Sequence, residues 1–447
     1  MATNKNGFNS TFGAIMAAAG SAMGLGNMWR FPYICGKYGG GAFLLVYIFF
    51  IFFIGMALMM SEFIIGRRTR QSPLQAFNTL RPKHKGWRMV GVLGLVTCFL
   101  VLAVYLVISG WTVNYFWESL IGRLAVVGES GGYESHFVEF ASSSVGPVVC
   151  LLVFLAINVV VILGGVKQGI ERVSKLLMPV MVVLLAVLCV RSVTLEGASE
   201  GLRYLFYPDF SLLTGEGVLA ALGQALFSLS VGLGVMIVYG SYLPEKDNLL
   251  TTSLWIVVCD LSVSILAGIA IFPAVFSCGL TPAEGPGLVY QVLPVVFDSM
   301  GAFGRIAAIM FFLLLVLAAL TSAISLLEAL TAAISEKGMK RSKAVMIVAA
   351  SGAVLAVLTS FSFGNGVLNH WHLFDILDKL TGTYLLAIGA LFIVIFLGWF
   401  VKSDEIHDEL SNHGTLKVGY FKVFYYFIIR FLAPVALLVV LVTGIIG

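Results

Sequence analysis

The sequence predicts an all-α integral membrane protein with eleven transmembrane helices, arranged as two five-helix inverted repeats plus one extra helix. Three observations lead to this prediction. Hydrophobic residues make up 59% of the 447 residues and charged residues only 11%, whereas charged residues are about 25% of a soluble globular protein. The chain contains eleven apolar runs, each close to the ~20 residues that cross a bilayer. The first and sixth runs are interrupted by glycines and polar residues.

The apolar runs occupy most of the chain and leave only short connections. In chain order we place them at Thr11–Cys35, Gly41–Ser61, Met89–Ser109, Pro147–Val166, Leu176–Val193, Gly217–Gly240, Leu249–Pro273, Phe303–Ile334, Ala344–Phe361, Thr381–Val401 and Val423–Gly444. This single transmembrane domain divides into a first five-span repeat at 1–195, a second at 196–401 and the eleventh span at 402–447. Because five is odd, the second repeat has the inverted orientation of the first.

Lysine and arginine are concentrated in alternate connections, which orients the chain because positively charged loops stay in the cytoplasm. The connection at 62–88 contains seven such residues, the connection at 110–146 contains only Arg123, and the connection at 274–302 contains none. We therefore expect a multi-pass protein of the cell's inner (plasma) membrane. Its N-terminus is cytoplasmic and its C-terminus external, since an odd number of spans separates them.

Two spans carry residues that disfavour a continuous helix. Between Gly20 and Pro32 the first span contains three glycines, an asparagine and an arginine, and the sixth span is glycine-rich between Gly223 and Gly234. A plain alternative is that Gly20-x-x-x-Gly24 is a helix-packing face. The two interruptions, however, occupy corresponding positions of the inverted halves, and paired broken helices of this kind mark the central site of secondary transporters. We expect both segments to unwind within the membrane.

Unwinding has a chemical consequence, because it frees backbone carbonyls for a cation and presents helix N-termini to an anion. Sodium is a hard cation that prefers oxygen ligands. Side-chain oxygens gather on these spans and their neighbours, at Asn27, Ser228, Asp260, Thr321 and Ser322. The pattern predicts a site for sodium ions and a zwitterionic amino acid.

The segment Gly24–Pro32 reads Gly-Leu-Gly-Asn-x-Trp-Arg-Phe-Pro, and with it the chain resembles the neurotransmitter:sodium symporter family and its bacterial amino-acid members. Tyr105, placed six residues before Trp111, and the segments 224–234 and 318–322 carry the same resemblance, which covers essentially the whole chain. The usual pattern has twelve spans, and the eleven found here match a variant seen among bacterial members.

The resemblance implies two sodium sites and no organic cofactor. The first would use the Ala22 carbonyl, the side chains of Asn27 and Ser228, an oxygen of span seven assigned to Asp260, and the substrate carboxylate. The second would use the carbonyls of Gly20, Met23 and Ala318 with the hydroxyls of Thr321 and Ser322.

The resemblance also implies a substrate pocket and two gates. The pocket would be formed by Leu25, Gly26, Val101, Tyr105, Phe227, Ser230, Leu233, Ser322 and Leu326. The external gate would pair Arg30 with Asp378 beneath the lid Phe227, and the internal gate would pair Lys5 with Glu336.

Two positions refine the expected function. Monoamine-transporting members carry an aspartate where this chain has Gly24, so the carboxylate here must come from the substrate, which favours amino acids. Leu233 and Leu326 make the pocket apolar and favour a bulky hydrophobic or aromatic side chain. Asp260 is a fixed carboxylate where chloride-dependent relatives have a neutral residue, so we expect chloride-independent transport; Asp260 could also take up a proton when the site empties.

Other functions fit the residues less well. No catalytic constellation is present, so we expect no enzymatic activity, and no long basic run suggests a nucleic-acid partner. A proton-driven amino-acid permease of the same architecture and a non-transporting amino-acid sensor stay as alternatives, although the Thr321–Ser322 hydroxyl pair favours sodium. We expect a monomer to suffice for transport, with a dimer possible.

In span five, Gly169 and Pro179 indicate either cytoplasmic unwinding or a simple proline kink.

Overall fold

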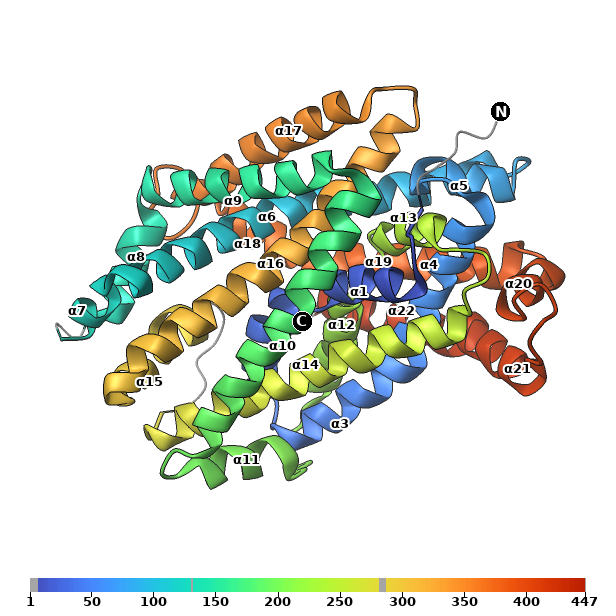
Figure 1. The fold of residues 1–447 in the computed structure, drawn as a ribbon. Coiled ribbons are helices and arrows are strands. Elements are labelled where there is room, and N and C mark those ends of the chain that lie inside the picture. The colour runs from blue at the N-terminus through green and yellow to red at the C-terminus, as the bar shows by residue number, and fades with distance from the viewer. Residues whose placement is uncertain (1–6, 130–131, 281–286, 447) are drawn as a thin grey trace.

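The computed structural model describes residues 7–129, 132–280 and 287–446, and within them the secondary structure is helical apart from one isolated antiparallel bridge between Gly40 and Pro208 (Figure 1). In this described part, nine helices are long and apolar enough to cross a membrane. The protein is therefore an all-helical, multi-pass membrane protein.

The nine long helices include short 3-10 and π turns, labelled η. They are Gly41–Thr69 (α3, η2, α4), Lys85–Ile121 (η3, α6), Gly146–Leu163 (α9), Val166–Val193 (η4, α10), Leu249–Ser277 (α14), Gly304–Ser335 (α16), Arg341–Phe361 (α17), Asn369–Phe400 (η7, α18, η8, α19, η9) and Gly419–Gly444 (α21, η10, α22). The parts used below are α4 (Met56–Thr69), α6 (Arg88–Ile121), η4 (Val166–Glu171), α10 (Arg172–Val193), α18 (Leu373–Lys379), α19 (Leu386–Ile395) and η9 (Phe396–Phe400).

The two segments that the sequence predicts as the first and sixth spans are each split into shorter helices. The first consists of α1 (Thr11–Ala22), η1 (Gly26–Arg30) and α2 (Phe31–Lys37), and the sixth of α12 (Gly215–Ser228) and α13 (Val235–Tyr242). Connecting helices are α5 (Pro73–Leu80), α7 (Arg123–Glu129), α8 (Tyr133–Ser142), α11 (Ala198–Phe206), α15 (Leu293–Ser299) and α20 (Ser403–Leu410).

Each predicted span falls on helical structure, but several predicted boundaries are wrong. The third span was expected to end at Ser109, whereas α6 continues to Ile121. The fifth was expected to begin at Leu176, whereas helical structure begins with the π turn η4 at Val166 and continues through Pro179 inside α10. Apolar runs report contact with lipid, and a helix can extend past the bilayer with polar residues that hydrophobicity does not mark as helical.

Small residues let the central helices approach closely. A Cβ atom on Gly66 of α4 would overlap the Ile237 carbonyl of α13, and one on Gly240 of α13 would lie 2.9 Å from the Phe63 Cα atom. α1 in turn packs against α10, α14 and α16, in the middle of the bundle (Figure 1). The broken helices are therefore enclosed by continuous ones.

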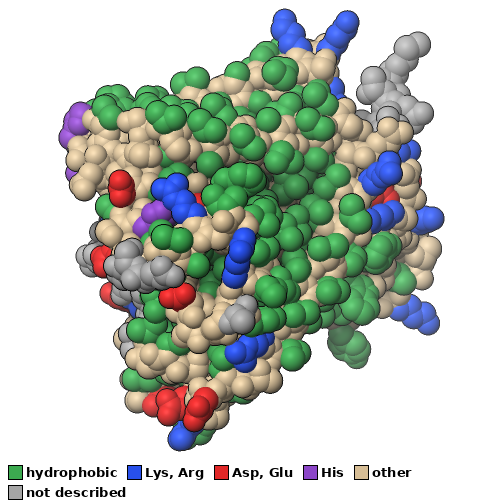
Figure 2. All heavy atoms as spheres, turned by 60° about the vertical axis from the view of Figure 1, so that its left-hand side comes forward, with side chains coloured by type: hydrophobic (Ala, Val, Ile, Leu, Met, Phe, Trp, Pro, Cys, Tyr) green, Lys and Arg blue, Asp and Glu red, His purple; other side chains and the backbone are tan. Residues whose placement is uncertain are grey.

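The outer surface is apolar over a wide area. Figure 2 shows a broad hydrophobic band on one face, with most charged side chains near its two ends. Val160 and Leu176 are 70% and 66% exposed. Large contiguous apolar surfaces are rare on soluble monomers, and lipid covers them in a membrane-spanning protein.

Candidate binding site at the two helix breaks

The first span loses its helical hydrogen bonding at Met23. α1 ends at Ala22, and Met23 still donates to the Ala19 carbonyl, but its backbone (φ −79°, ψ 63°) is no longer helical. Gly24 then donates to the Ala22 carbonyl in a tight turn, and helical structure returns at Gly26. The last carbonyls of a helix have no intrahelical donors; the Ala22 carbonyl accepts from Gly24 within the turn, and the second lone pair of its oxygen is open to a cation.

The second break is longer. α12 ends at Ser228 and α13 begins at Val235. In between, Ser230, Gly232 and Gly234 have φ values of 53°, 85° and 76°. Glycine adopts this left-handed backbone readily, whereas a serine there is uncommon. Strained backbone of this kind clusters at functional sites.

The two breaks are hydrogen-bonded to each other. Ser230 Oγ donates to the Ser21 carbonyl at 3.2 Å, and Gln224 Nε2 donates to the Gly26 carbonyl at 2.9 Å. Gln224 was not predicted as a site residue. Its signal in the sequence is a buried amide in an otherwise apolar stretch of α12, which needs a partner because unpaired buried polar groups are costly.

Glu62 of α4 is a second residue that sequence reasoning missed. Its carboxylate accepts hydrogen bonds from the backbone N–H groups of Gly232 at 2.6 Å and Ile237 at 3.3 Å. Glu62 is fully buried and is the only charged residue between positions 41 and 66. It supplies acceptors for N–H groups that the broken helix leaves without partners.

A buried polar cluster lies beside the first break. Asn27 Nδ2 donates to Asp260 Oδ1 and to Ser264 Oγ, both at 2.8 Å. Tyr47 Oη donates to Asp260 Oδ2 at 3.1 Å and lies 3.1 Å from Ser228 Oγ. The structure thus brings together three of the predicted sodium ligands, Asn27, Ser228 and Asp260, and adds Tyr47, which was not predicted.

The chemistry of this cluster suits a monovalent cation. Among the described residues, no lysine or arginine pairs with the buried Asp260 carboxylate, which accepts only from neutral donors. Asn27 Oδ1 is buried and has no hydrogen-bond partner. An isolated buried carboxylate is unfavourable, and a sodium ion held by Asn27 Oδ1, an Asp260 oxygen and a freed carbonyl would offset both deficits.

The residues predicted for the second sodium site line the contact between α1 and α16. Thr321 Oγ1 donates to the Ala318 carbonyl at 3.0 Å, and Ser322 Oγ donates to the Ser21 carbonyl at 3.0 Å. A Cβ on Gly20 would lie 3.3 Å from Thr321 Cβ. Met23, whose carbonyl was also expected there, lies in the turn at the end of α1. Three of the predicted ligand oxygens, those of Thr321, Ser322 and the Ala318 carbonyl, take part in internal hydrogen bonds.

A small cavity lies between the breaks. It has a volume of about 30 Å³ and is lined by Ser21, Ala22, Gly24, Gly26, Val101, Tyr105, Phe227, Ser228, Ser230, Leu233, Ser322 and Leu326. Tyr105 Oη accepts from the Leu25 N–H at 3.1 Å. A cavity of this size holds roughly two water molecules, so a bulky side chain can enter only after side chains in its wall rotate outward.

A second cavity, of about 80 Å³, shares Phe227 with the first as a lining residue. Leu25, Arg30, Tyr105, Phe227 and Asp378 are among its lining residues. The Arg30 guanidinium lies 4.5 Å from the Phe227 ring centre. Arg30 and Asp378 face the same cavity, but the described residues include no ion pair between them, so the predicted external gate is not in direct contact in this conformation.

Only one of the two residues of the predicted internal gate is among the described residues. Lys5 lies outside the described residues. Glu336 accepts hydrogen bonds from the Ser72 N–H at 3.2 Å and from the Ser72 hydroxyl, at the start of α5.

Other contacts close the end of the bundle that carries α5 and α20, and none of them was predicted. Arg67 Nε lies 2.6 Å from Glu409 Oε2, and both side chains are at most 4% exposed. The buried Glu328 carboxylate accepts from Arg341 Nη2 at 2.5 Å and from Tyr242 Oη at 2.7 Å. Each contact joins residues of different helices, separated by 342 residues for Arg67 and Glu409 and by 13 for Glu328 and Arg341, and periodicity within one helix does not reveal such pairs.

The N-terminal end of α1 is fixed at the same end of the bundle. Glu171 of η4 accepts from the Asn9 N–H at 2.8 Å and pairs with Lys175 at 2.6 Å. A Cβ on Gly13 would overlap the Glu171 side chain. The π turn at Gly169 therefore lies directly against α1, and Pro179 does not interrupt α10.

Comparison with known proteins identifies what the chain is similar to. The profile of the family described as "Sodium:neurotransmitter symporter family" matches residues 5–136 and 133–447. The uncharacterized sodium-dependent transporter YhdH of Bacillus subtilis (strain 168) is 39% identical over 436 residues, which cover 96% of each chain. An uncharacterized sodium-dependent transporter of Haemophilus influenzae is 34% identical, again with 96% of each chain covered.

A solved structure shares the fold. The crystal structure of MhsT in complex with L-phenylalanine superposes with a TM-score of 0.90 at 38% sequence identity, and the match covers 99% of this chain and 100% of that one.

Proposed function

The chain belongs to the sodium:neurotransmitter symporter family, and we propose that it imports amino acids with bulky hydrophobic or aromatic side chains by sodium-coupled alternating access. It is a sodium-dependent transporter and not an enzyme. The finer assignment, to two sodium sites, eleven spans in two inverted repeats plus one, and independence from chloride, is part of the proposal.

One observation carries the proposal, namely the unpaired oxygen of Asn27 beside a buried carboxylate. Asn27 Oδ1 has no partner, and Asp260 has only neutral donors around it. Sodium binds oxygen ligands of this kind. The cluster adjoins the cavity through Ser228, so a cation here lies close enough to share the carboxylate of a bound amino acid.

The amino-acid carboxylate is assigned to the space around Gly24. A Cβ on Gly24 would overlap Ser322 Oγ and lie 2.9 Å from Tyr105 Oη. A larger residue therefore cannot supply a protein carboxylate at this position without displacing both hydroxyls. The ligand's own carboxylate, close to Tyr105 and the N-terminus of η1, takes that role, which favours amino acids over amines.

The side-chain pocket accounts for the expected substrate class. Leu233 and Leu326 line the cavity with Val101 and Phe227 and supply apolar, rotatable walls. The related MhsT was crystallised with L-phenylalanine, which supports the same class for this chain. A pocket of this type discriminates poorly between hydrophobic side chains, by about 1–3 kcal/mol per methylene group, so we expect several hydrophobic amino acids to compete.

Alternating access is supported by the unequal ends of the bundle. The end with α5 and α20 is closed by the buried Arg67–Glu409 pair and the partly exposed Arg341–Glu328 pair, whereas a cavity lined by Arg30, Phe227 and Asp378 lies at the other end. By the distribution of lysine and arginine, the closed end faces the cytoplasm. Import then requires Phe227 and the Arg30–Asp378 pair to close over the substrate before the cytoplasmic contacts separate.

Reconstitution into liposomes tests the proposal. Uptake of labelled phenylalanine, leucine, tryptophan and glycine is measured with an inward sodium gradient, with choline in place of sodium, and with gluconate in place of chloride. We expect accumulation of the large hydrophobic amino acids that needs sodium and persists in gluconate. Equal uptake in choline would contradict sodium coupling.

The same liposomes separate the two alternatives. A proton-driven permease would accumulate substrate under an inward proton gradient without sodium, and the partnerless Asn27 Oδ1 weighs against it because a proton carrier does not require that oxygen. A sensor would bind substrate in a sodium-dependent manner but show no uptake above protein-free liposomes.

A further inference from the structure

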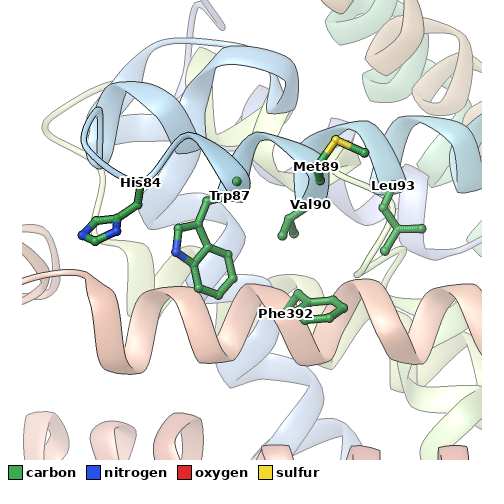
Figure 3. A pocket seen from close by; sticks show the side chains of 7 residues that line it. His84, Trp87, Met89, Val90, Leu93 and Phe392 are labelled. Carbon is green, nitrogen blue, oxygen red and sulfur yellow. The ribbon is translucent and has the colours of Figure 1, made fainter.

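An apolar groove lies on the outer surface of the bundle, away from the candidate site. It has a volume of about 610 Å³ and is lined by His84, Gly86, Trp87, Met89, Val90, Leu93 and Phe392. Figure 3 shows Val90 and Leu93 directed toward the Phe392 ring, which comes from the facing helix. The groove therefore runs between the start of α6 and α19.

The groove belongs to membrane-spanning helices. Its residues lie in the spans Lys85–Ile121 and Asn369–Phe400 or directly before them. Met89 is 65% exposed and Phe392 40% exposed. Apolar side chains exposed on a membrane span face lipid, so an acyl chain is the natural occupant of the groove.

The end of the groove at His84 and Trp87 is aromatic. The Trp87 ring lies 5.1 Å from the Phe396 ring and 4.7 Å from the Phe400 ring, and His84 lies 6.0 Å from Phe400. Trp87 here marks the level of the lipid headgroups, because tryptophan concentrates at the membrane–water interface.

Positive charge surrounds this end. Lys83, Lys85 and Arg88 alternate along the chain with the groove residues His84, Trp87 and Met89. All three cations are exposed and, among the described residues, none of them has an ion-pair partner. The nearby Arg81, by contrast, is paired with Glu405 at 3.3 Å. Exposed cations beside a membrane attract anionic headgroups.

We infer that this groove binds one anionic phospholipid, with an acyl chain between α6 and α19 and the phosphate beside Lys83, Lys85 and Arg88. The lipid comes from the leaflet that the positive loops face. The inference concerns the membrane-facing surface and does not depend on which substrate is transported.

The groove is connected to the candidate site through glycines of the same two helices that lie one to four residues from the groove residues. A Cβ on Gly94 of α6 would lie 3.3 Å from the Leu233 carbonyl, and one on Gly389 of α19 would lie 2.5 Å from the Gly232 oxygen. Leu93 and Phe392 are the groove residues next to these glycines. A lipid wedged between α6 and α19 therefore stabilises the packing that holds the second break.

The test uses the full chain, purified in detergent, freed of lipid and measured by native mass spectrometry. The probes are palmitoyl-oleoyl phosphatidylglycerol and phosphatidylcholine with the same acyl chains. We expect one tightly held phosphatidylglycerol, and a Lys85→Gln/Arg88→Gln double variant that binds it about 25-fold more weakly, at about fivefold for each cation. The matched control is Lys337→Gln/Lys343→Gln, which removes two exposed cations elsewhere in the cytoplasmic connections and is expected to change nothing.

The groove itself is tested by Leu93→Trp, which fills it, and by Phe392→Ala, which removes one wall should the larger side chain impair folding. Either variant is expected to weaken the binding of both lipids. It is also expected to abolish the rise in melting temperature that phosphatidylglycerol gives the wild type. Equal binding of the two lipids, or unchanged binding by both groove variants, overturns the inference.

Two other occupants give distinct results. If glycerol phosphate competes as strongly as the lipid and the groove variants have no effect, the site binds a free anion. If the variants change the oligomeric mass without changing lipid retention, the groove is an interface between two copies of the chain. Both results contradict the lipid assignment.

Discussion

Asp260 is the residue to which we assign the predicted independence from chloride. It is fully buried, its two carboxylate oxygens accept from Asn27 and Tyr47, and Ser228 and Ser264 complete the cluster. In the proposed mechanism, a fixed negative charge here offsets the charge of a co-transported sodium ion. A neutral residue would leave that charge to a mobile anion.

We predict that Asp260→Ser makes transport chloride-dependent. Serine removes the carboxylate and leaves space beside the Tyr47 and Ser264 hydroxyls, which can donate to an anion. Sodium-driven uptake should be lost in gluconate medium and recovered in chloride, whereas the wild type should be indifferent to the exchange. Asp375→Asn, which removes an exposed carboxylate, serves as the control and should behave like the wild type. Uptake by Asp260→Ser that is equal in both media would contradict the role given to Asp260.

A second prediction concerns the space available for a side chain at Gly24. In Gly24→Ala the added methyl group overlaps Ser322 Oγ and approaches Tyr105 Oη. Overpacking of this kind costs about 1–3 kcal/mol, so we expect substrate affinity to fall roughly tenfold, measured by equilibrium binding of labelled phenylalanine. Gly223→Ala in α12 is the matched control, because a Cβ there has no neighbour within 4 Å. Equal affinities for the two variants would show that the carboxylate binds elsewhere.

At the scale of an element, the second break depends on a residue from another helix. Glu62 of α4 uses one carboxylate oxygen for the Gly232 N–H and the other for the Ile237 N–H. The break could be predicted from its glycines, since they permit the left-handed backbone. Its support could not be predicted, because the two partners are separated by 170 residues in the sequence and only the fold brings them together.

Glu62→Gln should loosen this break. Glutamine offers one acceptor oxygen in place of two, so one buried N–H loses its partner, at a cost of about 1–3 kcal/mol. We expect a lower melting temperature and faster hydrogen exchange in the segment 229–237, with weaker substrate binding as a consequence. Glu216→Gln, an exposed position at the start of α12, is expected to leave exchange unchanged. Unaltered exchange in Glu62→Gln would mean that the break is stable without the carboxylate.

For the whole molecule, the sequence predicted those features that depend on residues close together in the chain. Apolar runs located the spans, and glycines and amides located the breaks and the polar residues around them, including Asn27 and Asp260. The contacts that set the state of the bundle were not accessible in this way. Arg67 and Glu409 are 342 residues apart and read separately as ordinary charges of polar connections, although together they form a buried pair.

That pair supports the last prediction, which concerns the conformational balance between the two ends. Breaking a buried ion pair by removing one partner costs about 3–5 kcal/mol, because the remaining charge is left uncompensated. Glu409→Gln leaves Arg67 in this position and should shift the protein toward conformations open at the α20 end. With the six native cysteines replaced, a cysteine at Ser21, which is 3% exposed, should react faster with a maleimide added from that side.

Glu405→Gln is the control for this shift, because Glu405 lies in the same helix but its contacts with Arg68 and Arg81 are partly exposed. Exposed ion pairs contribute about 0–1 kcal/mol, so labelling at Ser21→Cys should stay near the wild-type rate. Sodium should slow labelling in both variants, since it binds the conformation in which the breaks are enclosed. If Glu409→Gln is labelled no faster than Glu405→Gln, the Arg67–Glu409 pair does not hold the α20 end closed, and the Glu328–Arg341 and Glu171–Lys175 pairs must do so instead.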